Sequence, residues 1–186
     1  LEAVWKKESE SICAITIELI QGEAGFVYGT KHFYKEVFKW AKKRNLYIWV
    51  DEVQTFGRTR EMFAFQMFEL DEYVDIVTVG KALQVCGTLY SEELNPSPGL
   101  IAGTFNGALA TIIAGQKIVN YLRKGPFYGE NGRIHQIENA FLSSLKKLSE
   151  TTCKGKIKYY GGIGTMISFE VGDSEKPSTI NFIKKL

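Results

Sequence analysis

Apolar residues along the chain recur in two spacings, one typical of buried strands and the other of amphipathic helices. Residues 11–20 (SICAITIELI), 46–50 (LYIWV) and 75–79 (DIVTV) are short, β-branched and mostly apolar, and each predicts a buried strand. Between the first two lies a stretch that Thr30 can cap as a helix and that Asn45 ends. Strands separated by a helical stretch predict βαβ units in a mostly parallel sheet.

Three helices are predicted from apolar residues that recur every three or four positions. The first follows Thr30 and buries a face made of Phe33, Val37, Trp40 and Ala41. The second aligns Ile112, Gly115, Val119 and Leu122, and the third aligns Ile134, Ile137, Phe141, Leu145 and Leu148. Residues 83–91 are expected to be extended, residues 156–171 to form two strands with a bend at residues 161–164, and residue 181 to begin a helix.

Composition narrows the class of protein. With 186 residues, 45% of them hydrophobic, the chain has enough apolar material for one globular core and the edge of a second. Its 23 basic and 21 acidic residues nearly cancel, which argues against nucleic acid or an anionic membrane as a partner and favours small molecules or other subunits.

The cysteines and the apolar runs bear on compartment. Cys13, Cys86 and Cys153 are widely spaced and form no CxxC pair, so we expect a reducing compartment and no metal site. No apolar run approaches the roughly 20 residues that a membrane span needs, and the first residues lack the layout of a signal peptide. We therefore expect a cytoplasmic protein.

Two residues that can carry chemistry directly follow predicted strands. Asp51 follows residues 46–50, and Lys81 follows residues 75–79 after a single glycine. In open α/β sheets, ligands bind in the crevice at the carboxyl ends of the strands, where both residues are expected. On spacing alone, a single lysine is more often a solvated surface residue, and a cap of a helix or turn is an equally good interpretation of Asp51.

Several motifs add a family resemblance. Residues 51–59 (DEVQTFGRT), 62–65 (MFAF) and 75–81 (DIVTVGK) occur in this order, with 18–25 (ELIQGEAG) upstream and 103–107 (GTFNG) and 161–166 (GGIGTM) downstream. In order, spacing and strand context they resemble the class III (ω) aminotransferases, which depend on pyridoxal phosphate. The resemblance implies an α/β fold, the fold type I of pyridoxal-phosphate-dependent transferases, with a mostly parallel sheet and flanking helices. Residues 1–125 would be part of the large cofactor-binding domain, and residues 126–186 a connecting helix and the start of the C-terminal small domain.

The same resemblance assigns roles near the cofactor. Lys81 would form the Schiff base with pyridoxal phosphate, since burial beside a cofactor lowers a lysine pKa enough to make the amine a nucleophile. Asp51 would pair with the ring nitrogen and keep it protonated, so that the ring can store an electron pair. Val53 would pack against one ring face, and Gln54 would hydrogen-bond the ring hydroxyl. By themselves, a strand valine is usually core and a glutamine usually a surface residue.

Other roles concern the substrate and a second subunit. Thr104 resembles the threonine that reaches across a homodimer interface to the cofactor phosphate, with a plain turn as the alternative. Glu23 resembles the glutamate that pairs with an active-site arginine and moves aside for a substrate carboxylate, with a surface charge as the alternative. Phe26 and Tyr28 would line the pocket or belong to the core.

The chain departs from the family pattern at two places. A glycine is missing between Thr55 and Phe56, and residues 82–87 (ALQVCG) replace the usual Gly-Gly-x-Pro after Lys81. The second variant resembles the lysine ε-aminotransferase and 4-aminobutyrate aminotransferase branch. The family's phosphate-binding loop and substrate-binding arginine are expected before residue 1 and after residue 186, so the chain looks like a fragment.

The resemblance implies transamination from an ω-amino acid of the lysine, 4-aminobutyrate or ornithine type to a keto acid such as 2-oxoglutarate. Another pyridoxal-phosphate reaction, such as that of an aminomutase, and a non-catalytic module of the same fold are the alternatives.

Overall fold

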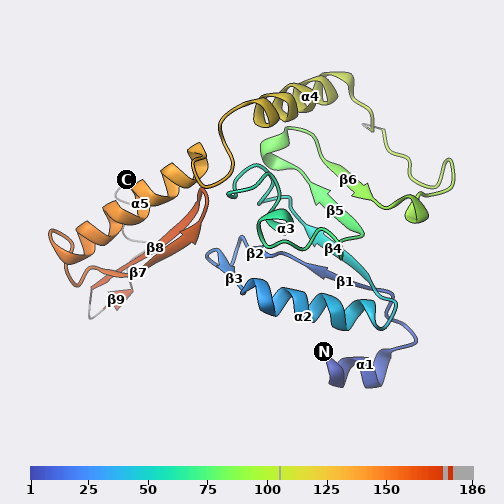
Figure 1. The fold of residues 1–186 in the computed structure, drawn as a ribbon, viewed down its shortest axis with the longest axis horizontal. Coiled ribbons are helices and arrows are strands. Elements are labelled where there is room, and N and C mark those ends of the chain that lie inside the picture. Colours follow the sequence, from blue (N-terminus) through green and yellow to red (C-terminus); the bar gives the residue numbers. More distant parts are fainter. Residues whose placement is uncertain (105, 174–175, 178–186) are drawn as a thin grey trace.

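The computed structural model describes residues 1–104, 106–173 and 176–177. Figure 1 shows the elements in chain order: α1 (Glu2–Glu8), β1 (Ala14–Ile17), β2 (Ile20–Gln21), β3 (Val27–Tyr28), α2 (Lys31–Lys42), β4 (Tyr47–Asp51), α3 (Ala64–Met67), β5 (Ile76–Val79), the 3₁₀ helix η1 (Lys81–Leu83), β6 (Gly87–Tyr90), the 3₁₀ helix η2 (Glu92–Leu94), α4 (Leu109–Lys124), α5 (Arg133–Glu150), β7 (Ile157–Ile163), β8 (Met166–Asp173) and β9 (Lys176–Pro177). Residue 105 of the GTFNG motif and the helix expected from residue 181 lie outside the described residues.

The main sheet has the strand order β1-β4-β5-β6. The pairs β1–β4 and β4–β5 are parallel, and β6 returns antiparallel to β5. The prediction of a mostly parallel sheet built from βαβ units is therefore confirmed. Within the described residues, no helix is both long enough and apolar enough to cross a bilayer.

One face of this sheet is apolar and the other is more polar. Val50 and Val77 are register partners and are buried, Val50 with the side chains of α2 and Val77 with those of α4. On the opposite face, Asp51 is the register partner of Thr78, and Thr78 is the partner of Thr88 on β6. These polar residues of β4, β5 and β6 thus share the face that the core does not use.

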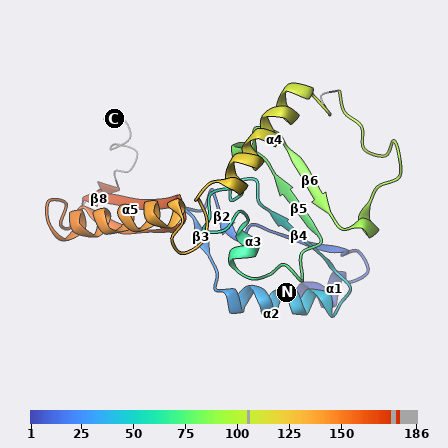
Figure 2. The same cartoon turned by 45° about the horizontal axis from the view of Figure 1, so that its top comes forward.

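The C-terminal residues form a second layer beside the main sheet. Helix α5 packs against β7, and β7 and β8 form an antiparallel hairpin to which β9 adds a short edge. Figure 2 shows this layer projecting away from the main sheet. Ile163 and Met166, on either side of the hairpin turn, are buried in the core cluster that contains α2. The hairpin turn is therefore the part of this layer that is anchored on the rest of the molecule.

Two strand predictions need correction. Residues 11–20 do not form one strand, because Glu18 accepts a hydrogen bond from the Gly22 amide at 3.1 Å and the chain turns there. Ile20 is still fully buried, but it pairs with β3 in a separate two-stranded sheet. Residues 83–91 are not extended throughout, since Leu83 closes η1 and only Gly87–Tyr90 form a strand.

The predicted helices are present, but their buried faces differ from the expectation. In α2, Thr30 caps Phe33 as predicted, yet Phe33 is 54% exposed while Tyr34 and Phe38 are buried. The Tyr34 hydroxyl donates to the Leu19 carbonyl at 2.5 Å, which turns this face of the helix inward.

The apolar faces predicted for α4 and α5 are also only partly buried. In α4, Ile112 is 45% exposed, whereas Gly115 is buried against η1. In α5, Phe141 is 56% exposed, and Glu138 is buried between Ile134 and Leu145. A carboxylate thus occupies part of the face that the spacing assigned to apolar side chains.

Candidate active site

Asp51 ends β4 and starts the turn that leads away from the sheet. Its Oδ1 accepts a hydrogen bond from the Val53 amide at 2.9 Å, so the carboxylate caps this turn. The turn-capping interpretation is correct for this oxygen. Because Asp51 also pairs in register with Thr78, its side chain lies on the polar face of the sheet, half-buried.

Lys81 is the first residue of η1, directly beyond β5, and its side chain is exposed. Its backbone has a φ of 43°, in the left-handed region that residues other than glycine rarely adopt. Such strain gathers at functional sites and is held in place by the surrounding structure. A Cβ added to Gly80 would lie 3.5 Å from Val53 Cγ1, so Val53 lies beside the residue that leads into Lys81.

Gln54 and Glu23 meet, although they are far apart in sequence. The Gln54 side-chain amide donates from Nε2 to Glu23 Oε1 at 3.0 Å. A Cβ at Gly22 would lie 2.3 Å from Gln54 Cδ, so a side chain there would displace the Gln54 amide from this position. Phe26 packs against the core, which favours its core interpretation, whereas Tyr28 is 43% exposed.

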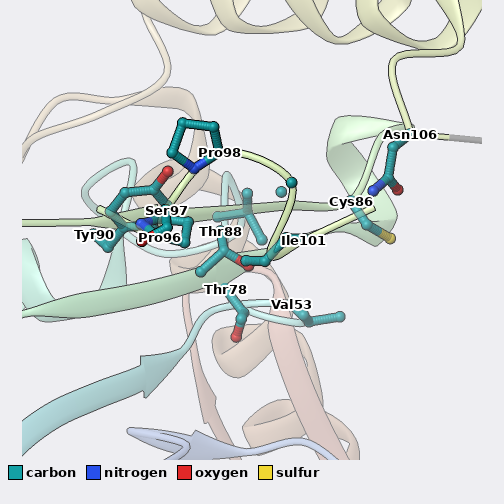
Figure 3. A pocket seen from close by; sticks show the side chains of 13 residues that line it. Val53, Thr78, Cys86, Thr88, Tyr90, Pro96, Ser97, Pro98, Ile101 and Asn106 are labelled. Atoms are coloured by element: carbon teal, nitrogen blue, oxygen red, sulfur yellow. The ribbon is translucent and has the colours of Figure 1, made fainter. Parts of the chain in front are cut away.

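A cavity of about 600 Å³ opens beside the polar face (Figure 3). Its wall includes Val53, Thr78, Thr88, Tyr90 and Asn106, together with residues 96–99 of the loop after η2. Thr104 is exposed and belongs to the same loop. Of the predicted site residues, Val53 lines this cavity.

The other predicted residues surround the same region of the sheet. Asp51 shares the sheet face of Thr78, Gln54 and Glu23 meet at the turn after β4, and Lys81 follows β5. The structure thus brings Gln54 and Glu23 into contact and sets Val53 beside Gly80, the residue before Lys81. Thr104 lies apart from these strand ends, in the loop between η2 and α4.

Glu52 was not assigned a role from the sequence, yet it is fully buried. It accepts hydrogen bonds from the amides of Ala64 at 3.0 Å and Phe65 at 2.9 Å, and from the Thr55 hydroxyl. Burial raises the pKa of Glu52, and these donors only partly offset that effect. The alternation of side chains along a strand was the available signal in the sequence. Glu52 is four positions after the buried Ile48, so its side chain is expected on the same face.

Sequence reasoning also missed an ion pair between the loop after β4 and α5. Arg60 donates from Nε to Glu138 Oε2 at 2.9 Å and from Nη2 to Oε1, while the Gly164 amide donates to Oε2 at 2.7 Å. The hydrogen bond to Glu138 raises the pKa of Arg60. The available signal was a glutamate on the apolar face of a helix, where a buried charge requires a partner.

Comparisons with known proteins test the family assignment. The aminotransferase class-III family matches residues 1–186. The chain belongs to this family. It is thereby a homologue of pyridoxal-phosphate-dependent class III aminotransferases.

Individual class III relatives are similar over part of their length. The acetylornithine aminotransferase of Aquifex aeolicus is 30% identical over 192 residues, which cover 100% of this chain and 47% of that protein. A probable mitochondrial 4-aminobutyrate aminotransferase of Caenorhabditis elegans is 28% identical over 170 residues, which cover 89% of this chain and 34% of that protein. The chain therefore spans less than half the length of these curated relatives.

A solved aminotransferase structure shows the same fold. The ornithine delta-aminotransferase of Plasmodium falciparum has a TM-score of 0.72 at 23% identity and covers 91% of this chain and 45% of its own. The α/β fold expected from the sequence is confirmed.

Proposed function

We propose that the chain is the cofactor-binding part of a pyridoxal-phosphate-dependent aminotransferase and that Lys81 binds the cofactor covalently. The observation that carries this proposal is the meeting of Asp51, Val53 and Gln54 at the end of β4, next to the end of β5 that leads into Lys81. These are the carboxyl ends of adjacent parallel strands, where α/β enzymes bind their ligands.

The residues present fit the groups of this cofactor. Asp51 offers a carboxylate to a protonated pyridine nitrogen, Val53 an apolar surface to the ring, and Gln54 an amide to the ring hydroxyl. Gly80 adds no side chain beside Val53, where a Cβ would lie 3.5 Å from Val53 Cγ1. When bound, pyridoxal phosphate supplies an electron sink for a carbanion at the substrate carbon.

Each residue then has a defined task. Lys81 would hold the cofactor through its amine, and the same amine would serve as the base for the proton on the substrate carbon. Asp51 holds the proton on the ring nitrogen. Glu23 would respond to a second substrate carboxylate, and its hydrogen bond to Gln54 supports a position near the cofactor.

The finer parts of the proposal follow the family. The amino donor is an ω-amino acid of the lysine, 4-aminobutyrate or ornithine type, and the acceptor is a keto acid such as 2-oxoglutarate. Thr104 reaches the cofactor phosphate of a partner subunit in a cytoplasmic homodimer. Residues 1–125 belong to the large domain, and residues 126–186 lead into the small domain.

Chemical trapping tests the central assignment. The chain is incubated with pyridoxal phosphate, reduced with borohydride and mapped by mass spectrometry, in parallel with Lys81→Ala and with Lys117→Ala, which alters an exposed lysine of α4. We expect one pyridoxyl group on Lys81, lost in Lys81→Ala and kept in Lys117→Ala. Label spread evenly over surface lysines, or no label, would reject the assignment. Formation of glutamate from each candidate donor and 2-oxoglutarate then separates transamination from the aminomutase and non-catalytic alternatives.

A further inference from the structure

Glu138 joins three segments that are distant in sequence. From the middle of α5, its carboxylate accepts two hydrogen bonds from Arg60 and one from the Gly164 amide in the turn between β7 and β8. The residue is only 2% exposed. The carboxylate therefore fixes where the β7–β8 turn lies relative to the loop that follows Gln54.

The turn in contact with Glu138 also binds the neighbouring loop directly. The Thr165 amide donates to the Arg58 carbonyl at 2.8 Å, and the Thr165 hydroxyl donates to the same oxygen at 3.2 Å. Gly164 has a φ of 64°, and a Cβ there would lie 2.2 Å from that carbonyl oxygen. Only glycine permits so close an approach, so the turn and the Arg58 backbone form one contact.

Arg58 carries this contact to the predicted cofactor residues. Its guanidinium donates from Nη1 to the Gln54 carbonyl at 3.0 Å, and the Gln54 side chain binds Glu23. A second hydrogen bond joins the hairpin to the loop that contains Glu23. The Ser168 hydroxyl of β8 donates to the Gly25 carbonyl at 2.9 Å. The hairpin thus supports both loops that meet at the Gln54 side chain.

We propose that Glu138 is a positioning residue for Gln54, acting through the β7–β8 turn and Arg58. The proposal rests on the proposed function, in which Gln54 contacts the cofactor. Residues beyond position 125 then determine how the cofactor is held, although none of them lies among the predicted cofactor-binding residues.

Isosteric variants separate the steps of this pathway. Glu138→Gln keeps the size of the side chain but turns an N–H group toward either Arg60 or the Gly164 amide, both of which are donors. Arg58→Met keeps an unbranched side chain and removes only the contact with Gln54. Glu150→Gln is the matched control, an exposed glutamate in the last turn of the same helix.

Two measurements on the ¹⁵N-labelled 186-residue chain need no cofactor: amide hydrogen exchange at Gly164 and the resonance of the Gln54 side-chain amide. In Glu138→Gln we expect exchange at Gly164 to be about ten-fold faster, as the loss of a hydrogen bond to a charged group implies, and the Gln54 resonance to move. In Arg58→Met we expect only the Gln54 resonance to move. Glu150→Gln should change neither.

A third measurement is the apparent Kd for pyridoxal phosphate, read from the yield of trapped Lys81. Both Glu138→Gln and Arg58→Met should raise it several-fold, and Glu150→Gln should not.

If exchange at Gly164 accelerates while the Gln54 resonance stays in place, Glu138 is merely structural and the proposal is wrong. If the wild-type chain does not bind the cofactor at Lys81, the proposed function fails, and the Gln54 resonance still decides the coupling. Should Glu138→Gln not fold, an unmoved Gln54 resonance in Arg58→Met overturns the proposal.

Discussion

Glu52 and Glu138 are buried carboxylates on either side of the loop between β4 and α3, and their surroundings differ. Glu52 is bound by neutral donors from its own neighbourhood, two backbone amides and the Thr55 hydroxyl. Glu138 is bound by Arg60 and by an amide from the distant β7–β8 turn. Neutral donors leave burial as the dominant influence on the Glu52 carboxylate, whose pKa is raised, whereas a cation compensates the charge of Glu138.

The difference shows two ways of fixing one loop. Glu52 closes a local turn, since all its partners lie within residues 52–65. Glu138 fastens that loop to a layer built much later in the chain. Local contacts determine the shape of the loop, and the distant contact determines where it lies.

The largest loss of stability is expected when the Glu52 carboxylate is removed. Glu52→Ala leaves two buried amides and a buried hydroxyl without an acceptor, at about 1–3 kcal/mol each, and adds a small cavity. We expect the free energy of unfolding, measured with urea, to fall by about 3–5 kcal/mol. Glu150→Ala, at an exposed position, should change it by less than about 0.5 kcal/mol. Equal losses in the two variants would contradict the role given to Glu52.

Loss of the Arg60–Glu138 ion pair should lower the free energy of unfolding by less. The cost of changing one of these residues should depend strongly on whether the other is still present. Arg60→Met leaves the Glu138 carboxylate without its cation, and we expect a loss of about 2–3 kcal/mol, because the Arg60 side chain is 41% exposed and water can partly replace it. Changing both Arg60 and Glu138 to Met should recover part of this loss. A double-mutant cycle from urea unfolding measures the coupling, and strictly additive losses would show that the pair is not a unit.

The smallest effect concerns how the contribution of Glu52 to stability depends on pH. The raised pKa means that folded Glu52 binds its proton more tightly than the unfolded chain does, so stability from this group is greatest in acid. It should fall as pH rises from the ordinary glutamate pKa, about 4.3, to the raised value, and stay constant above it. The stability of the wild type minus that of Glu52→Gln should therefore decrease across this window. A difference that rises with pH would have the wrong sign.

Local features of the fold were predictable from the sequence. Strand runs, the Thr30 cap and the order of the motifs gave the parallel sheet and placed Asp51 and Lys81 at its carboxyl edge, because these depend on neighbours within a few residues. The buried face of α2 was not predictable. Phe33 and Tyr34 are adjacent aromatic residues, and which of the two is buried depends on the hydrogen bond from Tyr34 to Leu19.

The features that could not be predicted depend on partners far apart in the sequence. Arg60 and Glu138 are 78 positions apart, and no local pattern pairs them. The contact between Gln54 and Glu23 likewise required the fold, since each residue alone is typical of a solvated surface. The residues proposed to carry chemistry were thus recognisable by motif, whereas the partners of Glu138 could be identified only from the fold.

The left-handed backbone of Lys81 has a consequence for engineering. Its φ of 43° suits glycine, and a residue with a side chain is held there at a cost of about 1–2 kcal/mol. A stability screen blind to catalysis would therefore rank Lys81→Gly among its improvements and discard the amine. The position at which the proposed chemistry is centred is one where selection for folding alone and selection for activity choose different amino acids.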